Sequence, residues 1–364
     1  VLGALTAASC AAPTASSDGP VAAPTSGATA PSSTELFDIA DRDPLPFPGY
    51  DVTRVTIAPL PGAPPIEEPA GPPLTGWAAF DAELAGAILG GGSDAMSVAV
   101  AIDGEIVHAA AFGARLPDTF DAVTVDDRFR IASISKTITA IVALQLVEDG
   151  VVGLDEPVGR HAAAVAAVPA PTDRAAGVTI RQLLTHTSGF PQYESVFFRN
   201  QVGSCEEAAG VGLTRSMGGG GFRYSNMNYC VLGLVIEHLT GQPYEAVVYE
   251  RLLTPLGISG MRLAPTYDPG PGEVEHRSVP GRNYMEVLGA AGAWVATPTD
   301  LVAIIDALDP DTPGWKPLEP ATVAMMKTSA TDGSVPDRGY AMGLILYGGG
   351  AAGHTGTIES THAM

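Results

Sequence analysis

A serine and a lysine three residues apart stand at the start of a long apolar stretch. Ser133 and Lys136 frame the pattern S-x-x-K, and we expect a buried helix from Ser133 to about Asp149. Residues i and i+3 of a helix share one face, so the lysine amine can reach the serine hydroxyl. Burial lowers the pKa of a lysine and leaves a neutral amine that can accept the hydroxyl proton. The spacing therefore predicts Ser133 as a nucleophile and Lys136 as its partner.

Two further short patterns carry side chains suited to the same chemistry. Tyr224 and Asn226 form Y-x-N at a helix start after a glycine-rich loop, where a phenol can project into a cleft and an amide can bind substrate. His354, Thr355 and Gly356 form H-T-G after a glycine-rich turn. A glycine in such a strand lets a substrate backbone pair closely with it. Each pattern alone is common, so it is the combination that has meaning.

S-x-x-K, Y-x-N and H-T-G, in this order, resemble the class C β-lactamase and serine DD-peptidase family, which also includes esterases. Three longer stretches add to the resemblance, and together they span roughly 77–358: the lead into the nucleophile at 129–133, the LLTHTSG-like segment at 182–189, and the stretch at 292–300. The resemblance implies a penicillin-binding type of serine hydrolase.

The resemblance also implies a role for each matching residue. Ser133 would form an acyl-enzyme, and Lys136 and Tyr224 would share the proton relay. The substrate would be held by Asn226, His354, Thr355 and Gly356, and the backbone N–H groups of Ser133 and Thr357 would form the oxyanion hole. His186, within the LLTHTSG-like segment, is expected to be structural. No metal or other cofactor is expected.

The substrate stays open among several classes. A DD-carboxypeptidase acting on wall stem peptides and a small-ester hydrolase are the first hypothesis; His354, where many relatives carry lysine, disfavours an efficient class C β-lactamase. The alternatives are an inactive paralogue that binds penicillin or wall peptides, and a truncated fragment. The sequence has no G-x-S-x-G elbow, H-E-x-x-H or Gly-Lys dipeptide, which disfavours an α/β-hydrolase, a zinc enzyme and a P-loop protein.

The expected fold is α/β (α+β): an antiparallel sheet flanked by helices, with an inserted helical subdomain at roughly 150–290 and the C-terminal strands of the family missing. This domain would occupy 74–364. Residues 11–73 are rich in Pro, Ala, Ser, Thr and Gly and indicate a disordered tether, with a short strand at 50–57. Residues 1–10 resemble the end of a signal segment with a lipobox.

Local patterns predict several elements. A helix is expected at 78–89, and a hairpin joins strands 97–102 and 105–112 through Asp103 and Gly104. A cap formed by Thr299 and Asp300 should begin a helix, and 340–347 is expected to be one strand.

Three cysteines and a strong acidic charge bear on location. Cys10 is either lipidated or incidental, and Cys205 and Cys230 form either a disulfide or two buried thiols. The formal charge of −21 disfavours nucleic acid and anionic membranes as partners. We expect an extracytoplasmic protein, secreted or lipid-anchored, that acts on a small molecule or peptide and touches the membrane only through that anchor.

Overall fold

The computed structural model describes residues 5–11, 76–91, 93–116, 119, 121–331, 338–347 and 350–364. The predicted tether beyond Ala11 and the strand expected at 50–57 lie outside these residues. Within the described ranges, no helix combines the length and apolarity needed to cross a membrane.

The described strands form three antiparallel sheets. A five-stranded sheet has the order β10-β11-β1-β2-β3, and two three-stranded sheets have the orders β4-β6-β5 and β7-β8-β9. The bounds are β1 Leu5–Ala11, β2 Ser93–Ile102, β3 Glu105–Gly113, β4 Phe129–Arg130, β5 Arg262–Leu263, β6 Trp294–Ala296, β7 Arg338–Tyr340, β8 Ile345–Tyr347, β9 Ala352–Gly353, β10 Gly356–Ile358 and β11 Thr361–Ala363. The antiparallel sheets alternate with helices along the chain, which confirms the expected fold class.

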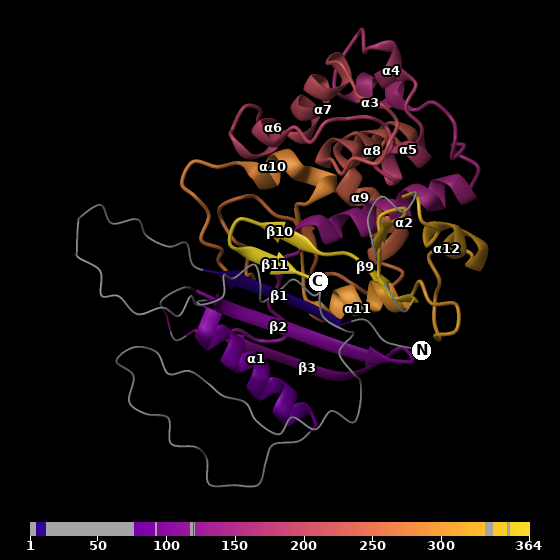
Figure 1. Cartoon of the computed structure of the whole chain (residues 1–364). Coiled ribbons are helices and arrows are strands. Elements are labelled where there is room, and N and C mark those ends of the chain that lie inside the picture. The colour runs from indigo at the N-terminus through magenta and orange to yellow at the C-terminus, as the bar shows by residue number, and fades with distance from the viewer. Residues whose placement is uncertain are drawn as a thin grey trace, which may run out of the picture.

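The helices lie around the large sheet and above it (Figure 1). Their bounds are α1 Trp77–Gly91, α2 Ser135–Glu148, α3 Gly159–Val165, α4 Asp173–Ala176, α5 Ile180–Leu184, α6 Glu194–Phe198, α7 Cys205–Thr214, α8 Asn226–Thr240, α9 Tyr244–Val248, α10 Tyr284–Leu288, α11 Pro298–Asp306 and α12 Pro320–Met326, with single turns η2 Ala132–Ile134, η3 Tyr249–Leu253 and η4 Gly289–Ala291. Helix α1 runs along β2 and β3, and α3 to α8 gather into one helical body. Helix α2 lies between that body and the sheet, as its nearly all-round burial requires.

The hairpin of β2 and β3 forms where the sequence predicts it. Asp103 and Gly104 both have positive φ, 53° and 82°, as a two-residue turn between twisted strands requires. Strand β2 is buried along most of its length, and Ala99 and Ala101 pack against Val302 of α11. The hairpin therefore forms a rigid wall behind the helices.

Strand β1 joins two parts of the large sheet. Its backbone pairs with β2 on one side and β11 on the other, and Ala8 lies opposite both Ser97 and Ala363. The strand includes Cys10, the residue that the lipobox pattern singles out. Lipidation of Cys10 stays a prediction, and it would place the same residues in a different role.

Two local predictions need correction. The cap of α11 is Thr297, whose hydroxyl accepts the backbone N–H of Asp300, while the Asp300 carboxylate accepts the N–H of Thr297. Thr299 instead lies inside the helix. The strand expected at 340–347 is a hairpin, β7 and β8, because Gly343 turns the chain with φ of 75° and packs against Ala140.

Candidate active site

Ser133 lies in the single turn η2, just before helix α2. The helix begins at Ser135, so the S-x-x-K pattern bridges η2 and α2 and does not start a regular helix. The preceding residue, Ala132, has a φ of 47°, in the left-handed region that non-glycine residues rarely adopt. This backbone presents a half-buried Ser133 at the end of a fully packed helix.

Lys136 is completely buried, and its amine nitrogen has three partners. Nζ lies 2.9 Å from Ser133 Oγ, 2.8 Å from Asn226 Oδ1 and 2.7 Å from the carbonyl oxygen of Ala291. Burial lowers the pKa of Lys136 well below its ordinary value. A neutral amine has two hydrogens and one lone pair. It therefore donates to Asn226 and Ala291 and accepts the proton of the Ser133 hydroxyl.

Tyr224 approaches Ser133 from the segment before α8. Its phenol forms a hydrogen bond with Ser133, and burial raises the pKa of Tyr224, so the phenol keeps its proton. The Tyr224 ring also lies over the amine of Lys136, with Nζ 5.0 Å from the ring centroid. Ser225 caps α8, since its side chain accepts the N–H of Met227. That cap fixes the direction in which Tyr224 and Asn226 point.

Strand β10 runs directly beside the nucleophile. A Cβ atom on Gly356 would lie 2.3 Å from the Ile131 carbonyl oxygen and 2.9 Å from the Ser133 nitrogen, so only glycine fits there. Thr355 and Thr357, on either side of it, are exposed. The H-T-G pattern is thus brought to the S-x-x-K pattern from more than 200 residues away in the chain.

His354 is buried and engaged at both ring nitrogens. Nδ1 lies 2.6 Å from the carbonyl oxygen of Thr355, and Nε2 lies 3.2 Å from the hydroxyl of Tyr340. Burial, with a smaller effect from Lys136, lowers the pKa of His354 to about 3. The imidazole is therefore uncharged at neutral pH.

Two contributors to the site are missing from the sequence argument. Tyr340 contacts both His354 and His186, and the carbonyl of Ala291 binds Lys136. A tyrosine at a strand end has no distinguishing pattern, and a backbone carbonyl has none at all. His186, expected to be structural, is fully buried and its ring lies 4.4 Å from that of Tyr224.

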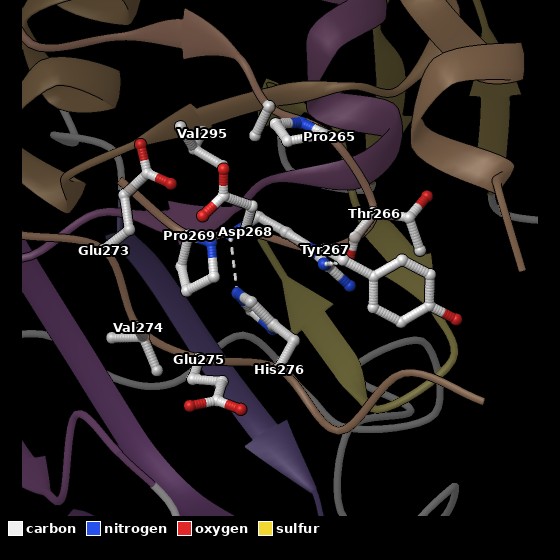
Figure 2. A pocket seen from close by; sticks show the side chains of 12 residues that line it. Pro265, Thr266, Tyr267, Asp268, Pro269, Glu273, Val274, Glu275, His276 and Val295 are labelled. Atoms are coloured by element: carbon white, nitrogen blue, oxygen red, sulfur yellow. Dashed lines mark hydrogen bonds between the residues drawn. The ribbon is translucent and has the colours of Figure 1, made fainter. Parts of the chain in front are cut away.

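A pocket of about 70 Å³ lies on the other side of strand β4, away from these residues. Figure 2 shows it between Tyr267, Asp268, Glu275 and His276, where Nε2 of His276 accepts the backbone N–H of Arg130. Neither Ser133 nor the side chains around it line this pocket. It is separate from the candidate active site.

The comparisons with known proteins agree with this geometry. The family model described as "Beta-lactamase" matches residues 80–364. The chain belongs to this family. Its members thus supply a context for Ser133 and Lys136, while the individual roles of the residues rest on the geometry above.

Three relatives illustrate the range of activities in the Beta-lactamase family. The D-alanyl-D-alanine-carboxypeptidase/endopeptidase AmpH of Escherichia coli K12 is 26% identical over 226 residues, 58% of this chain and 57% of AmpH. Esterase EstB of Burkholderia gladioli is 33% identical over 180 residues, 44% of each chain. The crystal structure of D-amino acid amidase from Ochrobactrum anthropi SV3 superposes with a TM-score of 0.57 at 28% identity, covering 74% of this chain and 87% of the amidase. The chain thus spans about half the length of these two curated relatives.

Proposed function

We propose that this protein is a serine hydrolase that forms an acyl-enzyme on Ser133 and cleaves an amide or ester bond. The observation that carries the proposal is the contact between the fully buried amine of Lys136 and the Ser133 hydroxyl, 2.9 Å apart. A buried amine with a lowered pKa is a base at neutral pH, and its only acidic neighbour among the three partners is this hydroxyl.

In the first half-reaction, Lys136 takes the proton of Ser133 while Oγ bonds to the substrate carbonyl carbon. The carbonyl oxygen becomes an oxyanion, which the N–H groups of Ser133 and Thr357 would bind. Collapse of this tetrahedral species breaks the bond to the leaving amine or alcohol. Tyr224, still protonated, gives its proton to that leaving group and regains one from Lys136.

In the second half-reaction, water replaces the leaving group. Lys136 and Tyr224 take a proton from the attacking water, and collapse returns that proton to Ser133 Oγ. The acid product leaves and the starting arrangement is restored. Asn226, which accepts from Lys136 through Oδ1, has its amide NH₂ free to hold a substrate carbonyl.

The substrate class is proposed from the relatives and from the site together. AmpH, EstB and the amidase act on D-alanyl peptides, esters and D-amino acid amides, as their names state. We propose wall-type peptides, D-amino acid amides or small esters as substrates. A class C β-lactamase activity is the lesser candidate, since His354 is uncharged where many relatives carry lysine.

The disulfide between Cys205 and Cys230 supports an extracytoplasmic location. It is one of the two alternatives that the sequence leaves open for these cysteines, and it ties α7 to α8 next to the site. Secretion or anchoring through Cys10 is part of the same proposal.

Intact-protein mass spectrometry tests the function. The protein is incubated with a fluorescent penicillin and, separately, with a p-nitrophenyl ester, and the adduct is located by peptide mapping. We expect an adduct on Ser133 that the variant Ser133→Ala lacks. Ser135→Ala is the matched control, because Ser135 lies in the same motif but its Oγ contacts the backbone of Trp294.

Three results separate the outcomes. An adduct that survives Ser133→Ala, or that disappears only in Ser135→Ala, would refute the assignment of the nucleophile. A folded wild-type protein with neither adduct nor ester turnover would support the inactive binding paralogue. The decay rate of a penicillin adduct separates a peptidase from a β-lactamase, since only the latter releases it quickly.

A further inference from the structure

Four side chains form a continuous hydrogen-bonded chain that ends at His354. The first link is at α8, where the backbone N–H of Ser225 and the amide of Asn228 both lie near Nδ1 of His186, at 3.2 and 2.9 Å. The next links join His186 Nε2 to the Tyr340 hydroxyl and that hydroxyl to His354 Nε2, each at 3.2 Å. The chain runs from the helical body to the strand beside the nucleophile.

The direction of every proton in this chain follows from its ends. A backbone N–H can only donate, so Nδ1 of His186 is an acceptor and the proton of this imidazole is on Nε2. The Thr355 carbonyl can only accept, so His354 carries its proton on Nδ1 and Nε2 is bare. Tyr340 therefore accepts from His186 and donates to His354. The phenol of Tyr229, which also neighbours Tyr340, gives its own proton to the Leu184 carbonyl.

The charged surroundings of the chain work in the same direction. Lys136 on α2 is the one cationic side chain in the described residues that lowers the pKa values of His186 and His354, after burial itself. Tyr224 lies against both imidazoles, with ring centroids 4.4 and 6.3 Å away. In the described ranges, no carboxylate forms a hydrogen bond with His186, Tyr340 or His354. Nothing in this set favours an imidazolium.

We propose that Tyr340 is a positioning residue that holds His354 in its Nδ1–H form, and that the site therefore selects acyl donors without a free carboxylate next to the scissile bond. This inference rests on the proposed function. A carboxylate that leaves water needs a cation or several donors in return. The His354 ring spends its one N–H on Thr355 and offers none to a substrate, so an amide or ester end fits and an acid end does not.

A matched pair of substrates tests this selectivity. N-acetyl-D-alanyl-D-alanine and its C-terminal amide contain the same scissile bond and differ only in the terminal charge. We expect the wild-type kcat/KM for the amide to exceed that for the acid by about tenfold or more, the effect of one missing charged hydrogen bond. Equal values, or a preference for the acid, would overturn the inference.

Tyr340→Phe tests the positioning role. Without the hydroxyl, Nε2 of His354 loses its donor and can take a proton from water. We therefore expect the preference for the amide to shrink several-fold as the pH falls from 7.5 to 5.5, through a lower KM for the acid and with little change in kcat for the amide. Tyr267→Phe is the control, because Tyr267 is exposed and donates to Val279 away from the site. A pH-independent preference in Tyr340→Phe would refute the positioning role.

A long-range proton–nitrogen NMR spectrum of the histidine rings reads the tautomer without any turnover. We expect a proton on Nδ1 of His354 and on Nε2 of His186, with both assignments made by single histidine variants. The opposite tautomer at either ring would overturn the inference even in an active enzyme. Failure of the proposed function shows differently, as the absence of any adduct on Ser133 with both the penicillin and the ester.

Discussion

The Cα of Gly356 lies so close to the backbone of Ser133 that a Cβ atom there would stand 2.9 Å from the Ser133 nitrogen. Strand β10 and the turn η2 thus touch through bare backbone at the point where the oxyanion hole is proposed. The contact brings the two proposed N–H donors, from Ser133 and Thr357, to the same place.

Gly356→Ala should therefore push β10 away from the nucleophile. We expect acylation of Ser133 to fall about 10²–10³-fold, the cost of one lost oxyanion donor, because the Thr357 N–H moves out of position. Gly353→Ala is the matched control, since a Cβ at Gly353 meets no atom within 4 Å. Acylation rates by mass spectrometry measure both, and an active Gly356→Ala enzyme would argue against this oxyanion hole.

The state of Lys136 makes a prediction about pH. Its pKa lies well below 10.5, so the amine is already neutral at pH values where a solvent-exposed lysine is charged. We expect kcat/KM for acylation to reach its plateau well below pH 10.5 and to fall tenfold per pH unit on the acid side, as the amine takes up a proton. Tyr224, whose pKa is raised, adds no loss of rate up to about pH 10.

Lys136→Arg provides the matched test of that assignment, because a guanidinium stays protonated throughout this range. It should abolish acylation at every pH, while Lys327→Arg, at an exposed position, should leave the profile unchanged. A wild-type rate that keeps rising up to pH 10.5 would contradict a lowered pKa for Lys136.

Three buried imidazoles predict a loss of stability in mild acid. Burial lowers the pKa values of His186, His276 and His354 below the ordinary 6.5, to about 3 for His354. The unfolded chain binds these protons below pH 6.5 and the folded chain does not, so the free energy of unfolding is largest above pH 6.5 and falls as the pH drops. Each ring contributes about 1.4 kcal/mol per pH unit in that window.

Urea unfolding measured at half-unit steps from pH 7.5 to 5 checks this slope. The window ends at pH 5 to stay above the range in which most carboxylates titrate. Together the three rings give a slope of up to about 4 kcal/mol per pH unit. A free energy of unfolding that stays constant between pH 6.5 and 5 would show that at least the burial of these rings is not maintained in solution.

The disulfide between Cys205 and Cys230 should stabilise the helical body. It closes a loop of 25 residues, for which the loss of chain entropy in the unfolded state gives about 3–4 kcal/mol. Unfolding in urea with and without a reducing agent measures this contribution. Cys10→Ser, which leaves the pair intact, should show the same difference; a reductant without effect would mean that the two thiols are free in solution.

The parts of the site that the sequence predicts are those held together by short-range geometry. Ser133 and Lys136 are three residues apart, so helical spacing alone suffices to bring them together. Tyr340 and the Ala291 carbonyl reach the site only through tertiary packing of β7 and η4, and no local pattern marks them. Because β7 and β8 alternate apolar residues across a glycine turn, they also read as one strand.

The same distinction explains the outcome at the large sheet. The turn at Asp103 and Gly104 fixes the pairing of β2 with β3 through adjacent residues, and it is predicted correctly. The pairing of β1 with β2 and β11 depends on residues at opposite ends of the described chain, and the small, mixed residues of β1 match a processed leader equally well. Composition alone does not separate these two roles.

The position of β1 has a consequence for the order of folding. The contact of Ser133 with Lys136 closes almost no loop, whereas the ladder that pairs Ala8 with Ala363 closes nearly the longest loop the chain offers. Loop closure and high contact order slow the formation of such pairings. The nucleophile and its base should thus be in place well before β10 and β11 settle beside them. A newly made molecule would carry its reactive pair early and gain the other wall of its site last.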